Sequence, residues 1–106
     1  MQKYRIIYLA EALKELDAVS ERHFELVGIN SSINIVRKIQ EDIRHLEYVP
    51  YIGKPLSEPR LADRKLMVLI SGNYLCFYRI EGEIIYIHHI IDGRTDYIKR
   101  LLYSKL

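Results

Sequence analysis

The spacing of hydrophobic residues divides the N-terminal half of the chain into a strand followed by a helix. In residues 3–9, KYRIIYL, apolar or aromatic groups occupy both alternating faces. This predicts a short strand that is covered on at least one side. From Ala10 onward the apolar spacing lengthens to three to five residues, which predicts an amphipathic helix ending near Gly28. Its apolar positions are Leu13, Leu16, Val19, Phe24 and Val27.

A second amphipathic helix is predicted directly after the first. Asn30, Ser31 and Ser32 offer N-cap side chains for its start. Its apolar stripe is Ile35 or Val36, then Ile39, Ile43 and Leu46, and it ends before Pro50. The short connection predicts a helical hairpin. Residues 49–60 contain all three prolines and are interpreted as a loop.

The C-terminal half has strand-like patterning. Residues 64–70, 74–80 and 84–91 are rich in β-branched and aromatic residues and are separated by the turn sequences SGN and EGE. Gly93 ends the last strand, and an apolar pattern in residues 98–102 predicts a short amphipathic tail. The order predicts one α+β domain over residues 1–106: a small, mainly antiparallel β-sheet with an N-terminal helical hairpin packed on one face and a short C-terminal helix.

Composition indicates a globular protein in a reducing compartment. The chain is 49% hydrophobic and 28% charged, and its single cysteine, Cys76, lies in an apolar strand where a small buried side chain is expected. No segment has the length of a signal peptide or a membrane span, so a cytoplasmic location is expected. Residues 10–48 hold five Lys/Arg and eight Asp/Glu, a balance of −3. Residues 49–106 hold nine and six, a balance of +3, which favours a basic face for an anionic partner.

The candidate chemical residues contain no metal-site pattern. His88 and His89 are adjacent, so in a regular strand they point to opposite faces, and satisfied or exposed histidines are expected. The sequence D-G-R-T-D-Y at 92–97 is more informative, because loops at strand ends often carry function. Arg94 is expected either to contact a target or to form a salt bridge with Asp92 or Asp96; both roles can hold together.

Nearly the whole chain resembles the RelE/ParE family of bacterial type II toxins. The resemblance rests most on the hairpin G-N-Y-x-x-x-Y-R-I of residues 72–80 and on G-R-x-D-Y of residues 93–97. It implies a compact sheet with a helical hairpin, and a toxin that halts bacterial growth until a cognate antitoxin neutralises it. No cofactor and no metal are expected, because the sequence has no Cys/His ligand spacing and no phosphate-binding glycine loop.

The resemblance implies two alternative activities. RelE-like members cut messenger RNA in the ribosome, and such a nuclease requires a proton-abstracting group and cations around the phosphate. Arg94 and Tyr97 match that role in position, and Lys65, at the very start of its strand, is the further candidate. An arginine commonly follows the hairpin tyrosine in RelE-like members, whereas here Leu75 follows Tyr74. This favours a ParE-like growth inhibitor acting on DNA gyrase. The alternatives are a ribosome-dependent mRNA endoribonuclease, or a degenerate member kept as an antitoxin-binding or DNA-autoregulation partner.

The antitoxin is expected to cover apolar and basic surface in a groove between the hairpin and the sheet, in a toxin–antitoxin hetero-oligomer. The residues expected to bind target or partner are Lys54, Arg60, Arg64, Lys65, Arg79 and Arg94.

Overall fold

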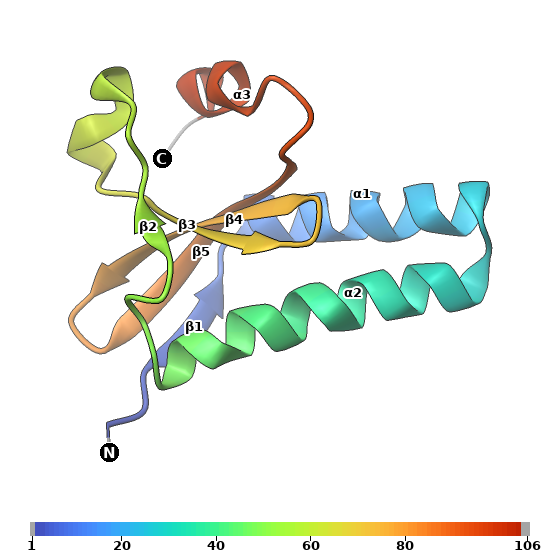
Figure 1. Ribbon diagram of the computed structural model, residues 1–106, viewed down its shortest axis with the longest axis horizontal. Helices are drawn as coiled ribbons and strands as arrows, with labels where there is room; N and C mark the ends of the chain where they lie inside the picture. The colour runs from blue at the N-terminus through green and yellow to red at the C-terminus, as the bar shows by residue number, and fades with distance from the viewer. Residues whose placement is uncertain (1, 105–106) are drawn as a thin grey trace.

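The computed structural model describes residues 2–104 and contains a five-stranded sheet with helices on both faces (Figure 1). The elements are β1 (Arg5–Tyr8), α1 (Ala10–Leu26), α2 (Ile29–Arg44), the 3₁₀ turn η1 (His45–Glu47), β2 (Lys54–Pro55), the 3₁₀ helix η2 (Pro59–Arg64), β3 (Met67–Ser71), β4 (Tyr74–Glu81), β5 (Ile84–Asp92) and α3 (Tyr97–Tyr103). The predicted α+β architecture, with its N-terminal helical hairpin and short C-terminal helix, is therefore confirmed.

The strand order in the sheet is β1-β5-β4-β3-β2. β1 pairs with β5 in parallel, and the other three pairings are antiparallel. The two tight turns place Gly72 and Gly82 at φ of 58° and 60°, the left-handed region that glycine adopts most readily. The β4–β5 register shifts between Phe77 and Tyr78, which leaves His88 without an opposite residue. The last strand therefore carries a β-bulge at its histidine pair.

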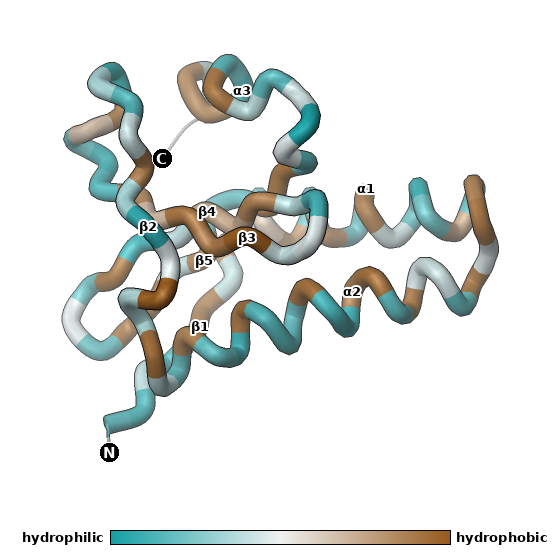
Figure 2. Tube along the Cα trace, viewed as in Figure 1, coloured by the Kyte–Doolittle hydropathy of each residue, from teal (hydrophilic) through white to brown (hydrophobic). Residues whose placement is uncertain are grey.

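Two apolar cores lie on the two faces of the sheet. The larger core is formed between the sheet and the hairpin, where α2 contributes Ile39 and Ile43 and the sheet contributes Tyr78 and Ile87, all at most 1% exposed. The smaller core lies on the opposite face, under η2 and α3, and is centred on Phe77. Figure 2 shows the apolar residues concentrated on the strands and at periodic positions of α2. The predicted stripe of the second helix is thus confirmed.

The prediction for the first helix was wrong in part. Leu16 and Val19 are buried as expected, but Leu13, Phe24 and Val27 are 49%, 55% and 74% exposed. The end of the hairpin extends beyond the sheet (Figure 1), so Phe24 and Val27 have no strand to pack against. The buried face of α1 adds Ala12 and Glu15 to Leu16 and Val19.

Two local predictions were also wrong. α2 begins at Ile29, with Gly28 at its N-cap (φ 130°) and no side-chain cap. The hydroxyl of Ser32 donates instead to the Ile29 carbonyl at 2.9 Å, because it already lies inside the first turn. The predicted loop at 49–60 contains the two-residue strand β2 and the start of η2. Proline tolerates both settings, an edge strand and the first turn of a helix.

Candidate functional site

At the end of β5, the buried carboxylate of Asp92 accepts hydrogen bonds from Arg94. Asp92 is 6% exposed, and its Oδ1 accepts hydrogen bonds from the Arg94 backbone N (2.9 Å) and from Arg94 Nε (3.0 Å). Its Oδ2 accepts from Arg94 Nη2 at 2.8 Å, and Arg22 Nη1 of α1 lies 3.6 Å from the same oxygen. Hydrogen bonding from Arg94 is the main cause that lowers the pKa of Asp92 to about 2. The carboxylate is therefore charged at neutral pH.

The turn that follows β5 is fixed by further hydrogen bonds. The Gly93 N–H donates to the Asn73 carbonyl at 2.8 Å, and the Thr95 hydroxyl donates to the Asp92 carbonyl at 2.6 Å. Asp96 then caps α3 by accepting the backbone N–H of residue 99 at 3.2 Å. The arginine within this turn is held in one orientation by its backbone and its carboxylate partner, while its side chain remains 67% exposed. The turn thus presents a cation at the surface.

Beside this turn, a cleft of about 230 Å³ opens between α1, the end of β5 and α3. Its walls include Arg22 from α1, Tyr74 from β4, Asp92 and Thr95 from the turn, and Arg100 from α3. Sequence reasoning missed Arg22 and Arg100. Both lie on helices, outside the 92–97 motif, and only the packing of α1 and α3 beside the strand end brings them to it.

A buried glutamate connects the same three elements. Glu15 of α1 is 8% exposed; its Oε1 accepts from the Ile90 N–H (3.0 Å) and lies 3.2 Å from His89 Nδ1, and its Oε2 accepts from Arg100 Nη2 (3.0 Å). β1 ends at Tyr8, so beyond that point the outer edge of β5 has no strand partner. Glu15 satisfies the Ile90 amide in place of a strand. The sequence contained a signal for this role, because Glu15 is a charged residue on the apolar face of α1.

Tyr97 lies at the start of α3 and packs into the smaller core. Its ring is 5.9 Å from the Phe77 ring, with an interplanar angle of 36°. The side chain is half-buried against this core, and so is that of Leu75. Tyr97 therefore anchors α3 to the sheet as well as lying three residues from Arg94.

The three residues considered for nuclease chemistry are only partly brought together. Arg94 and Tyr97 share the turn and first residue of α3, whereas Lys65 ends η2 in a left-handed conformation (φ 53°) before β3. The register aligns Ser71, the last residue of β3, with Tyr74 and Asp92. Lys65 and Arg94 consequently flank opposite ends of the sheet, separated along it by β3, about 13 Å at about 3.3 Å per residue.

Four of the six basic residues expected to bind a target or partner form a basic flank, defined as Lys54, Arg60, Arg64 and Lys65. They lie on β2, on η2 and just before β3, at the β2 edge of the sheet. Lys54, Arg60 and Lys65 are exposed, and Arg60 pairs with the carboxylate two positions before it at 2.8 Å. Arg64 is half-buried and donates to the Leu101 carbonyl of α3. This flank is outside the packed contact between the hairpin and the sheet.

Arg79 belongs neither to the basic flank nor to the turn that follows β5. It lies on β4 opposite Tyr86, and its Nη2 is 3.7 Å from Glu81 Oε1. Burial, together with the nearby His89 and Arg79 side chains, lowers the pKa of His88. Arg79 follows Phe77 by two positions on β4, so it points to the same face of the sheet as the smaller core.

The cysteine and the histidines do not form a metal site. Cys76 is fully buried, as predicted, and burial raises the pKa of its thiol to about 12. Within residues 2–104, no three His, Cys, Asp or Glu side chains are grouped so that they could hold a metal ion. Every helix in this part of the chain also falls short of the length and apolarity that a membrane crossing requires.

Comparison with known proteins identifies the family. Residues 6–97 match the family described as the ParE toxin of the type II toxin–antitoxin system, parDE. The chain belongs to the ParE toxin family. A search of curated proteins finds no match.

Two solved structures share the fold of this ParE-family chain. One is from the chromosomal ParDE TA system of P. aeruginosa, with 21% identity and a TM-score of 0.73, over 85% of this chain and 96% of that chain. The other is from the toxin–antitoxin complex RelBE2 of Mycobacterium tuberculosis, with 21% identity and a TM-score of 0.63, over 85% and 98%. At this identity the likeness establishes the shared fold.

Proposed function

We propose that this ParE-family toxin inhibits growth by acting on DNA gyrase in the bacterial cytoplasm, without cutting RNA. The observation that carries the proposal is the charge arrangement around Arg94 and Tyr97. Arg94 is bonded to Asp92, Leu75 occupies the position after the hairpin tyrosine, and Lys65 flanks the other end of the sheet. An RNA-cleaving site needs several cations within contact distance of one phosphate.

The expected loss of RNA-cleavage rate from a missing cation also favours gyrase over messenger RNA as the target. Losing one group that stabilises the transition-state charge typically costs about 100- to 1,000-fold in rate. A site that keeps Arg94 but lacks the hairpin arginine would therefore cut RNA slowly. Arg94 is instead suited to binding a protein, because it is exposed yet held by Asp92 and so loses little conformational freedom on contact.

The test uses the purified protein in two parallel assays. We expect no cleavage of messenger RNA on programmed ribosomes above background, and a rise in gyrase-dependent cleavage of plasmid DNA. Arg94→Ala should weaken the gyrase effect by about 10-fold or more, the scale of a hot-spot residue. Lys38→Ala is the control, since Lys38 is also an exposed cation paired with a carboxylate, Asp42 at 2.6 Å, but it lies on α2. Circular dichroism and thermal melting verify that both variants fold.

Two other outcomes would replace the proposal. Cuts in the ribosomal A site that disappear in Tyr97→Phe and Arg94→Ala would identify a RelE-like mRNA endoribonuclease. Inactivity in both assays, with retained antitoxin binding, would identify a degenerate member that serves as a binding partner.

We also propose that a cognate antitoxin binds this chain and covers the basic flank in a toxin–antitoxin hetero-oligomer. Both solved relatives come from toxin–antitoxin systems. The exposed side chains of Lys54, Arg60 and Lys65 suit an acidic, disordered segment that folds on binding. Lysine and arginine labelling of the co-purified complex checks this, and labelling equal to that of the free chain would contradict it.

A further inference from the structure

Two arginines from distant parts of the chain meet at the buried carboxylate that ends β5. Arg94 Nη2 lies 2.8 Å and Arg22 Nη1 lies 3.6 Å from the same oxygen, Asp92 Oδ2. These two nitrogens are therefore at most 6.4 Å apart. The side chains of Arg94 and Arg22 are 67% and 55% exposed, whereas that of Asp92 is 7% exposed. Arg22 and Arg94, the arginine pair, are thus held close together at the surface by one buried carboxylate.

Most hydrogen-bond donors of the arginine pair have no partner within residues 2–104. A guanidinium group carries five N–H donors. Arg94 uses two of them on Asp92, one from Nε and one from Nη2, and its Nη1 donates to no acceptor in this part of the chain. Arg22 forms the 3.6 Å ion pair but no hydrogen bond there. Several donors are therefore available to an acceptor that comes from outside the chain.

The charges of the cleft beside the arginine pair leave a surplus of one cation. Together with Arg94, the lining carries four basic side chains against three acidic ones: Lys14, Arg22, Arg94 and Arg100 against Glu11, Glu15 and Asp92. Arg100 is already paired with Glu15 at 3.0 Å, and Arg94 is paired with Asp92. The carboxylate of Asp92 can balance only one of the two guanidinium groups beside it, so one added carboxylate would balance the other.

We propose that the arginine pair binds one Asp or Glu side chain of the target, DNA gyrase. Guanidinium groups bind carboxylates through paired N–H donors, and they are more weakly hydrated than ammonium groups, which suits them to a covered interface. Asp92 offsets the repulsion between the two arginines in the free chain, so the pair is assembled before the target arrives. The inference rests on the proposed function, because it takes gyrase as the partner; it adds a second contact residue, Arg22, and the chemical class of the group that is bound.

A carboxylate suits this site better than the phosphate backbone of DNA. The α1 wall of the cleft carries the exposed Glu11 and the buried Glu15. A nucleic-acid backbone brings a row of negative charges, which the unpaired carboxylate of Glu11 repels. A single acidic side chain brings one charge, and the cleft of about 230 Å³ has room for it. The favoured occupant is therefore a protein side chain.

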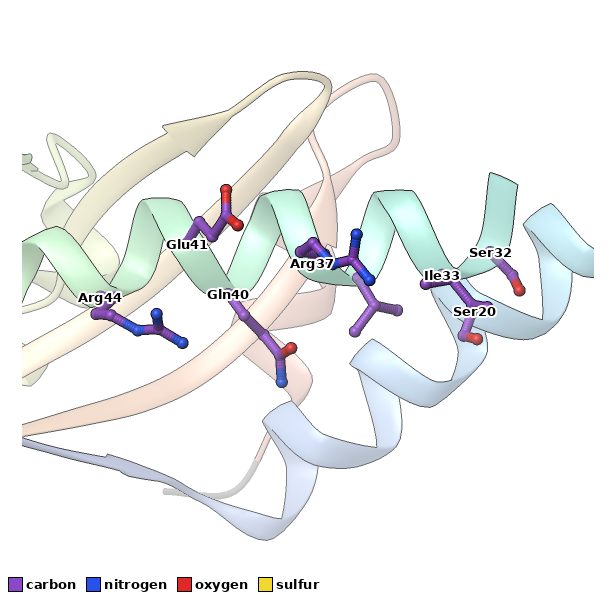
Figure 3. A pocket seen from close by; sticks show the side chains of 8 residues that line it. Ser20, Ser32, Ile33, Arg37, Gln40, Glu41 and Arg44 are labelled. Atoms are coloured by element: carbon purple, nitrogen blue, oxygen red, sulfur yellow. The ribbon is translucent and has the colours of Figure 1, made fainter. Parts of the chain in front are cut away.

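The first measurement is the affinity of purified gyrase for the toxin and its variants. Arg22→Ala and Arg94→Ala should each weaken the affinity by about 10-fold or more. Because both arginines act on the same carboxylate, the double variant should weaken it by less than the product of the two single effects. Arg37→Ala is the control and should change it by less than about 3-fold. Arg37 is also an exposed arginine, but it lies on α2 in the groove between the two long helices (Figure 3). Circular dichroism verifies that each variant is folded.

The second measurement identifies the group that is bound. Arg22→Lys places an amine at this position, and a carbodiimide couples an amine to a carboxylate in contact with it, with loss of water. In the mixture of this variant with gyrase and plasmid DNA, we expect an amide cross-link from position 22 to an Asp or Glu of gyrase, located by mass spectrometry. Arg37→Lys should give no cross-link from position 37. An arginine that only held Asp92 would give a cross-link within the toxin instead.

The outcomes separate this inference from the proposed function. Gyrase binding that Arg94→Ala weakens while Arg22→Ala leaves it within about 3-fold would overturn the arginine-pair site and keep gyrase as the target. Weakening by Arg22→Ala without a cross-link to gyrase would overturn the contact, because Arg22 would then act only through Asp92. A cross-link from position 22 to DNA would overturn it in favour of a phosphate. If the unaltered toxin does not bind gyrase at all, the proposed function fails, and this inference with it.

Discussion

Glu15 offers the sharpest test of how the strand end is held together. In Glu15→Ala the Ile90 amide loses its partner while remaining buried, and an orphaned buried donor costs about 1–3 kcal/mol. The contact with buried His89 adds about 1 kcal/mol. The pair with Arg100, whose side chain is 51% exposed, adds less than about 1 kcal/mol. The total expected loss of unfolding free energy is about 3 kcal/mol, and the amide dominates it.

This ranking predicts the behaviour of three further variants. Glu15→Gln keeps an oxygen acceptor for the Ile90 amide and should lose only about 1 kcal/mol. Arg100→Ala should lose less than about 1 kcal/mol. Asp17→Ala, at an exposed position of the same helix, should stay within about 0.5 kcal/mol and serves as the control. Urea unfolding followed by circular dichroism measures all four. The reasoning fails if Glu15→Gln or Arg100→Ala destabilises the protein as much as Glu15→Ala, because the ion pair would then dominate.

Three further predictions concern stability. The folded-state pKa of Asp92 is about 2 against an ordinary 3.8, so its carboxylate stabilises the fold above pH 4. This stability, about 1–2 kcal/mol after allowance for its exposed arginine partner, should be lost as the pH falls from about 4 to about 2, and Asp92→Asn should remove that pH dependence from thermal melts. Ile43→Ala should cost about 2–5 kcal/mol in urea unfolding, whereas Phe24→Ala, at a 55% exposed position, should cost less than about 1 kcal/mol; equal losses would place the core elsewhere. Gly53→Ala should cost about 1–3 kcal/mol, since its Cβ would lie 2.5 Å from the Tyr78 hydroxyl, and an unchanged melting temperature would contradict this.

The sequence was most informative where periodicity reports burial against a single large surface. The stripe of α2 was predicted correctly because Ile39 and Ile43 pack on the sheet along the middle of the helix. The stripe of α1 was mispredicted at Phe24 because periodicity identifies an apolar face and does not reveal where the sheet ends. Short-range patterns also missed β2, whose two residues pair with β3 through contacts distant in sequence.

The candidate site was predictable in its core and not in its surroundings. The 92–97 motif indicated the contact between Asp92 and Arg94, since these residues are neighbours in the chain. Arg22 and Glu15 come from α1, about 70 residues earlier, and only the three-dimensional packing places them there. Pairing partners between strands are likewise not encoded in a single strand's pattern, so the parallel pairing that leaves the β1 edge open was not predictable.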